Sequence, residues 1–420
     1  MVKKNILLIV PWLPFPLSSG GHQAIFNGIE ALKDDYNLFI SYPDNNTTDD
    51  QRNRSIFLEE IGGNIHLFPF FIDQKQEKIT LSQRITSKLH SLLNRIHKPK
   101  TKPNNPYSWW IEELLPKPKA FINHVAKIIA DHNIDAVQCE MVRNLPFVLS
   151  LPSSVKTIFI HHELGFARHN LELNSLSSDY FDGQAICNWA KCLEISLLNK
   201  FDHIVTLSST DSKKLKEAGV TTKIYNSFAT IKTTAVTDFK SDNPYELSFI
   251  GPDNHLPNLV GLKWFLDNCW SSLLQKDANY HLKIIGRWTE TNISAFSAQY
   301  ANLSFLGFVD DLKSALQNTI LIVPITIGSG IRMKILEAAN LGIPFISTTV
   351  GAEGIPVING THCLIADNPS EFIDAILLLK DDKKRMMFIR NAHQMIQERY
   401  SLEALRQNRL ALYSSIFSLS

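Results

Sequence analysis

Short apolar runs alternate with amphipathic stretches through the first half of the chain. Residues 5–10 form a mostly apolar run, which is typical of a parallel strand covered on both faces. A loop containing Gly20 and Gly21 follows, and apolar residues then recur at helical spacing over 25–32. Residues 43–54 are polar and rich in Asn and Asp, so we expect a surface loop there. Further strands are predicted at 36–42, 136–139, 157–161 and 203–207.

The same alternation resumes in the second half, near Tyr245. Strands are predicted at 246–250, 281–285, 303–306, 319–323 and 344–347, with helices at 262–274, 311–317, 331–341 and 370–380. This alternation predicts two doubly wound α/β domains, 1–230 and 245–395, with a polar linker at 231–244 and a C-terminal helical segment at 396–420. Ligands bind beyond the carboxyl ends of the strands in such sheets, so we expect the active site in a cleft between the domains.

The composition excludes several classes of protein. Lys and Arg total 42 against 41 Asp and Glu, and this net charge of +1 argues against a general nucleic-acid binder. The five cysteines are scattered and form no CxxC pair, which indicates neither a disulfide framework nor a zinc site. No apolar run reaches the ~18 residues of a membrane span. Prolines interrupt the N-terminal run where a signal peptide would continue, so we expect a cytoplasmic protein with reduced cysteines.

One stretch departs from this balance. Residues 74–102 carry many cations and the single acid Glu77, and apolar residues recur at helical spacing within 84–102. Such a basic amphipathic stretch could lie on an anionic membrane surface at the cytoplasmic face and bring a lipid-linked acceptor to the first domain. The alternative is an ordinary helix that packs its apolar stripe on its own domain.

The densest chemical segment follows an apolar strand of the second half. Gly328, Ser329 and Gly330 form a loop in which a ligand can approach the backbone, and a helix is predicted to begin directly after it. Free N–H groups and the positive dipole end make such a helix start favourable for an anion. Arg332 and Lys334 oppose the helix dipole there, so they suggest a bound anion, most simply a diphosphate.

Glu337 is the only acid in this predicted helix. It lies on the helix beyond the two cations, where its carboxylate could accept hydrogen bonds from sugar or ribose hydroxyls. The alternative for the whole segment is a surface helix with ordinary solvated charges.

This segment resembles the family-4 glycosyltransferases of the GT-B fold. The matching residues are Gly330, Glu337-Ala338-Ala339-x-x-Gly342-x-Pro344, and a run GSGIRMKILEA that is similar to a bacterial branch found in polysaccharide-assembly clusters. Upstream the resemblance continues through Phe249-Ile250-Gly251, Leu282-Lys283-Ile284-Ile285-Gly286-Arg287 and Leu306-Gly307-Phe308-Val309-Asp310-Asp311. It covers residues 245–400 well and the first half more weakly.

The resemblance implies two facing Rossmann-like domains with an interdomain cleft and a last helix that crosses back to the first domain. It implies a retaining transferase that moves a hexose-type unit from a nucleoside diphosphate sugar to a hydroxyl of a glycan or lipid-linked glycan. The chain has no Asp-x-Asp motif, so we expect neither a metal nor a cofactor. Two alternatives stay open: a non-catalytic GT-B scaffold that binds nucleotide sugar or glycan, and a nucleotide-sugar epimerase.

The sequence departs from the family at two places. The wider family has a pair of glutamates, and Ser329 stands at the position of the first. The family also places an Arg and a Lys after the first strand of the donor domain, where this chain has Pro252-Asp253-Asn254-His255. The resemblance suggests that Arg332 and Lys334 supply that charge, with Arg287 as a third candidate.

Two features of the first half are candidates for the same site. The resemblance implies that the Gly20-Gly21 loop packs against the donor phosphates, whereas a plain strand-to-helix turn is the alternative. Strand alternation points one of His161 and His162 inward, and we favour His162 near the donor sugar and acceptor. A structural histidine pair, or a metal fragment with Glu163, are the alternatives, but no third ligand stands at helical spacing.

Overall fold

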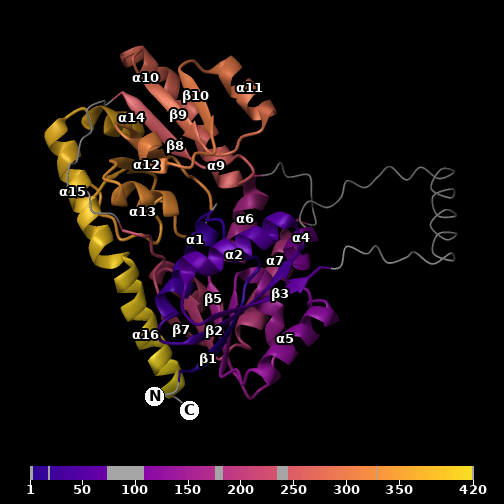
Figure 1. The fold of residues 1–420 in the computed structure, drawn as a ribbon. Helices are drawn as coiled ribbons and strands as arrows, with labels where there is room; N and C mark the ends of the chain where they lie inside the picture. The colour runs from indigo at the N-terminus through magenta and orange to yellow at the C-terminus, as the bar shows by residue number, and fades with distance from the viewer. Residues whose placement is uncertain are drawn as a thin grey trace, which may run out of the picture.

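The computed structural model describes residues 3–17, 19–72, 108–175, 183–233, 245–328 and 330–418. The basic stretch 84–102, most of the predicted linker and Ser329 lie outside the described residues. The described chain forms two parallel sheets, one in each half, each covered by helices (Figure 1). This is the α/β architecture that the alternating pattern predicts. Among the described residues, no helix combines the length and the apolar character needed to cross a bilayer.

The first sheet has the strand order β3-β2-β1-β4-β5-β6-β7. The strands of this sheet are β1 (Asn5–Ile9), β2 (Asn37–Asp44), β3 (Ile65–Phe71), β4 (Ala136–Glu140), β5 (Lys156–His161), β6 (His203–Thr206) and β7 (Lys223–Asn226). The interior of β1 is fully buried, which explains its uninterrupted Ile and Leu residues. The helices are α1 (Gly20–Leu32), α2 (Thr48–Ile61), α4 (Ser108–Glu112), α5 (Lys119–Asp131), α6 (Gly165–Ser175), α7 (Gly183–Leu198) and α8 (Ser209–Glu217), with the 3₁₀ segment η1 (Val142–Ser150).

The second sheet has the order β10-β9-β8-β11-β12-β13. Its strands are β8 (Glu246–Ile250), β9 (His281–Ile285), β10 (Leu303–Gly307), β11 (Ile320–Val323), β12 (Phe345–Ser347) and β13 (Leu364–Ile365). The helices are α9 (Leu256–Phe265), the π segment η2 (Leu266–Trp270), α10 (Ser271–Lys276), α11 (Glu290–Gln299), α12 (Leu312–Leu316), α13 (Met333–Asn340), α14 (Pro369–Leu378), α15 (Asp382–Arg399) and α16 (Leu402–Ser418). Every strand predicted in this half is present.

The prediction of a surface loop at residues 43–54 is wrong for most of these residues. Strand β2 continues to Asp44, and helix α2 begins at Thr48. Thr47 caps this helix, because its side chain accepts from the Asp50 N–H while the Asp50 carboxylate accepts from the Thr47 N–H. The polar composition therefore belongs to a capped, exposed helix.

The two C-terminal helices run along one side of both halves (Figure 1). Helix α15 contacts α13 of the second half, and α16 contacts α1 of the first. Between them, the Tyr400 carbonyl accepts a hydrogen bond from the Ile231 N–H at 3.1 Å. Near the end of α16, the Ile416 carbonyl accepts from Lys156 Nζ at 2.8 Å. The end of the first half at Ile231 and the junction of α15 and α16 at Tyr400 therefore lie side by side.

Candidate functional site

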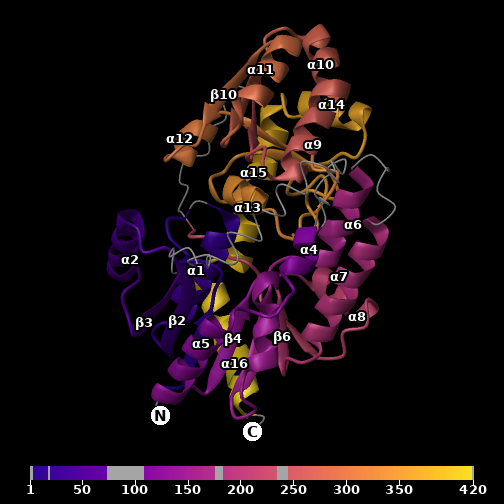
Figure 2. The ribbon, with the colours of Figure 1, turned by 90° about the vertical axis from the view of Figure 1, so that its right-hand side faces the viewer.

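The loop before α13 brings the second half against the first. Gly328 and Gly330 have φ angles of 115° and 84°, values that side-chain-bearing residues rarely adopt. A Cβ added to Gly330 would lie 3.3 Å from the His162 carbonyl oxygen. Figure 2 shows α13 facing α1 across the two halves. The predicted glycine loop is therefore a point of close approach.

Arg332 is the N-cap residue of α13 and is buried. Its Nη1 donates to the Gly330 carbonyl at 2.8 Å, and a Cβ on Gly328 would lie 2.7 Å from its Nη2. Burial lowers the pKa of Arg332, whereas Glu163 of the first half is the strongest of the carboxylates that oppose this shift. The guanidinium thus occupies the boundary between the halves.

Lys334 extends from the first turn of α13 to the carboxyl end of β8. Its Nζ donates to the Ile250 carbonyl and to Asn258 Oδ1, the latter at 2.8 Å. Burial, together with the neighbouring Arg332, lowers the pKa of Lys334 to about 7, and Glu337 opposes the shift. The ammonium group therefore lies beside the segment in which the family's usual Arg and Lys are missing.

Glu337 joins the two halves directly. Its Oε1 accepts from Gln23 Nε2 of α1 at 2.9 Å, and burial raises the pKa of this carboxyl. One turn earlier on α1, a Cβ on Gly20 would lie 2.8 Å from Met333 Cγ, and one on Gly21 would lie 3.0 Å from a first-half methionine. The predicted loop is thus wrong at Gly20 and Gly21, which are the first residues of α1, and Gly20 lies against the start of α13.

His162 ends a chain of buried polar side chains. Its Nε2 lies 2.5 Å from Glu140 Oε2, and Glu140 Oε1 accepts from Gln138 Nε2. Gln138 Oε1 in turn accepts from the Tyr413 hydroxyl of α16. The sequence analysis missed Glu140, although Gln138 and Glu140 at alternate positions of an otherwise apolar strand were an available signal.

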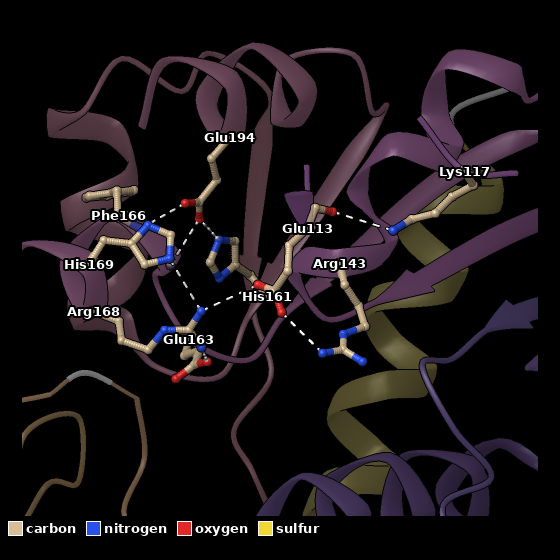
Figure 3. Close-up of polar contacts among 10 residues, drawn as sticks. Glu113, Lys117, Arg143, His161, Glu163, Phe166, Arg168, His169 and Glu194 are labelled. Carbon is tan, nitrogen blue, oxygen red and sulfur yellow. Dashed lines mark hydrogen bonds and ion pairs between the residues drawn. The ribbon is translucent and has the colours of Figure 1, made fainter. Parts of the chain in front are cut away.

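His161 points to a different partner. Its Nε2 lies 3.1 Å from Glu194 Oε1, and both side chains are fully buried. Glu194 also accepts from the Gly165 and Phe166 N–H groups, at 3.2 and 2.9 Å, so it caps the start of α6 (Figure 3). His161 is therefore a structural residue in this geometry.

The His-His-Glu run does not form one metal site. His161 and His162 contact different carboxylates, and Glu163 pairs with Arg168. Within the described ranges, no group of three or more His, Cys, Asp or Glu side chains is placed to hold a metal ion.

Arg287 follows β9, and its backbone carbonyl accepts from the Asp253 N–H at 3.3 Å. Its side chain is exposed, and its guanidinium lies 5.5 Å from the centroid of the Phe308 ring. Ser329 lies outside the described residues, so its role stays a prediction.

His255 is a further neighbour of this cluster that the sequence analysis did not single out. Desolvation lowers its pKa to about 4; Glu163 opposes the shift, and Lys334 and Arg332 reinforce it. The segment without the family's Arg and Lys thus lies within electrostatic reach of the α13 cations.

The chain is similar to known proteins in sequence and in fold. Residues 245–382 match the family model described as "Glycosyl transferases group 1". An "Uncharacterized 44.6 kDa protein in cps region" of Klebsiella pneumoniae is 27% identical over 169 residues, which span 38% of this chain and 42% of that protein.

The solved structures extend the likeness to the whole chain. HepE of Anabaena, in complex with UDP-glucose, has a TM-score of 0.66 at 13% identity, covering 98% of this chain and 99% of that one. Sucrose-phosphate synthase of Thermosynechococcus elongatus has a TM-score of 0.70 at 14% identity over 100% of both chains. The resemblance inferred from the sequence is therefore confirmed: the chain has the GT-B fold, and its second half matches the group 1 glycosyltransferases.

Proposed function

We propose that this protein transfers a sugar from a nucleoside diphosphate sugar to a hydroxyl of a glycan or lipid-linked glycan. The observation that carries the proposal is the placement of Arg332 and Lys334 at the start of α13, beside the carboxyl end of β8. A diphosphate there would meet two cations and free helix N–H groups. The matched family supports transfer, and the HepE structure with UDP-glucose supports this class of donor.

Each residue of the site has a role in the proposed reaction. Arg332 and Lys334 stabilise the negative charge that builds on the leaving diphosphate, so the transfer proceeds without a metal ion. Glu337 accepts hydrogen bonds from donor hydroxyls, and Gly20 and Gly21 at the start of α1 let the donor approach the backbone. His162 orients the sugar or the acceptor hydroxyl. Retention of anomeric configuration and a hexose donor are part of the proposal, on the strength of the family resemblance.

The test measures thermal stability with UDP, GDP, ADP and CMP. A ligand that binds only the folded protein raises the melting temperature, so one nucleotide should raise it by a few degrees. We expect the Arg332→Ala/Lys334→Ala variant to lose this shift. The matched control is Lys383→Ala/Lys384→Ala, which removes two exposed cations from α15.

The sugar form of the selected nucleotide then separates the candidate activities. A transferase consumes the donor when an acceptor hydroxyl is present, whereas an epimerase converts the donor alone and a scaffold binds without turnover. No melting shift with any nucleotide at millimolar concentration would contradict the proposed donor site.

A further inference from the structure

A cavity of about 550 Å³ lies at the carboxyl edge of the first sheet. Its walls come from the segment after β1, the carboxyl ends of β2 and β3, the end of α4 with the connection to α5, the start of α5, and η1. Phe70 and Phe121 form one apolar wall, with ring centroids 4.6 Å apart and an interplanar angle of 10°. The site residues described above are not among those that line it. The position at the carboxyl edge is nevertheless the one at which parallel sheets bind ligands.

Two cations, Lys117 and Arg143, and two carboxylates, Glu112 and Glu113, line this cavity, which we call the basic cavity after its cations. The side chain of Lys117 is half-buried, and its Nζ donates a long hydrogen bond of 3.5 Å to the Glu113 carbonyl. Burial lowers the pKa of Lys117 and Arg143 adds to this shift, while the Glu113 carboxylate opposes it. Glu112 also lines the cavity but is exposed. Lys117 therefore lies near a second positive charge, and among the described residues no carboxylate forms an ion pair with it.

The nearest carboxylate is already committed to two arginines. Glu113 Oε1 lies 3.2 Å from Arg143 Nη2, and Glu113 Oε2 lies 3.5 Å from Arg168 Nη2 (Figure 3). The Glu113 carboxylate is thus shared between two guanidinium groups and also acts on Lys117 from nearby. An anion that enters the basic cavity would give Lys117 an ion-pair partner of its own.

The same ion pairs connect the basic cavity to the donor loop. Arg168 Nη1 pairs with Glu163, and a Cβ on Gly330 would lie 3.4 Å from the Glu163 Cβ. Arg143, Glu113, Arg168 and Glu163 therefore form a line of alternating charges that ends at the glycine loop of α13. A ligand in the cavity would occupy the first half, which the family resemblance assigns to the acceptor.

We propose that the basic cavity binds an acid group of the acceptor, a phosphate or a carboxylate, so that the enzyme selects acidic acceptors. Lys117 supplies a point charge and Arg143 a planar fork, which together suit anionic oxygens. The apolar wall of Phe70 and Phe121 lowers the local dielectric constant and strengthens this attraction. The inference rests on the proposed function only in treating the bound molecule as an acceptor.

Three probes of the same size test this selection by calorimetry on the full chain without donor. They are octyl glucoside, which is neutral, octyl glucuronide, which carries a carboxylate, and the octyl glucosyl phosphodiester. We expect at least one acid probe to bind about tenfold more tightly than the neutral one, because it gains one charge-assisted hydrogen bond. Binding of the phosphodiester alone would identify a phosphate-linked acceptor, and binding of the glucuronide alone an acidic sugar.

Lys117→Gln and Arg143→Gln should each remove this preference. The matched control is Lys119→Gln, an exposed lysine at the start of α5 that does not line the cavity. Raising the salt concentration on the wild-type protein should weaken the acid probes and leave the neutral probe unchanged, which tests the charge without any substitution. Equal binding of all three probes, no binding of either acid probe, or an unchanged preference in both variants would overturn the inference.

Nucleotide-induced stabilisation, measured on the same variants, separates this inference from the proposed function. Lys117→Gln and Arg143→Gln should keep the melting shift with the selected nucleotide, because neither residue touches α13 among the described contacts. If no nucleotide stabilises the wild type, the donor proposal fails while the acid preference remains measurable. If a nucleotide stabilises the wild type but the acid probes bind no more tightly than the neutral probe, only the inference about the basic cavity fails.

Discussion

At the scale of single residues, Lys334 shows how position changes the chemistry of a side chain. The sequence places it in a helix start, where it opposes the dipole, and the fold adds burial and a neighbouring guanidinium. Its pKa of about 7 means that part of its charge is absent in the free protein at neutral pH. A bound diphosphate favours the charged form and would raise that pKa again. Donor binding is therefore expected to take up a proton.

This coupling gives a pH dependence of nucleotide binding with a definite sign. Above about pH 7 Lys334 is largely neutral in the free protein and must take up a proton when the nucleotide binds. The affinity for the selected nucleotide should therefore fall, by up to about tenfold for each unit of rising pH. Calorimetry between about pH 7 and pH 8.5, in buffers of different ionisation heat, measures both the affinity and the proton uptake. Lys334→Arg, whose charge does not titrate in this range, should lose the dependence. If the wild-type affinity is constant across this pH range, the predicted proton uptake by Lys334 is wrong.

At the scale of elements, strand β4 connects the C-terminal helix to the site. Its residues Gln138 and Glu140 are buried on one face and link the Tyr413 hydroxyl of α16 to His162. A carboxylate against one ring nitrogen fixes the orientation of an imidazole. We therefore regard Glu140 as a positioning residue that acts through His162.

Glu140→Gln keeps the shape of this side chain and removes its charge. We expect kcat for sugar transfer to fall by about ten- to a hundredfold, in the range seen when a partner of a functional histidine is lost, with KM for the donor little changed. The matched control is Glu246→Gln, which alters a carboxylate 2.8 Å from His281 on β8 and β9. Equal effects of the two substitutions on kcat would show that Glu140 serves stability alone.

The sequence predicts elements better where the signal is local. β8 and β9 have the predicted bounds, because their apolar runs sit between clear turn signals. The strands β3, β7 and β13 were missed because they lie at sheet edges and carry no long buried run. The capped helix α2 was missed because its polar surface resembles a loop, although Thr47 and Asp50 stand at capping-box spacing.

The same distinction explains which parts of the candidate site could be predicted. Arg332, Lys334 and Glu337 lie within one helix turn or two of each other, so their proximity is readable from spacing. Gln23 meets Glu337 only through the folding of both halves, across 314 positions of sequence. The same is true of Glu163, which follows His162 in the chain but acts on Arg332 from the opposite half.

At the scale of the whole molecule, the site depends on how closely the two halves approach. Among the described glycines, a Cβ added to Gly20, Gly330 or Gly354 would lie within 3.3 Å of an atom of the opposite half. Near the end of α15, the Ile231 N–H donates to the Tyr400 carbonyl. We expect the rate of transfer to respond to the separation of the halves as well as to the residues that bind the donor.

Gly330→Ala tests this dependence, and Gly360→Ala is its matched control. Both glycines have positive φ angles, 84° and 74°, so both substitutions should cost about 1 kcal/mol of unfolding free energy through backbone strain. A methyl group on Gly330 would also press on the His162 carbonyl 3.3 Å away, whereas nothing lies within 4 Å of one on Gly360. We therefore expect similar melting temperatures for the two variants, and slower sugar transfer for Gly330→Ala alone. If transfer is equal in both, the contact between the glycine loop and the first half has no part in catalysis, and the donor half would act without the close approach that the structure shows.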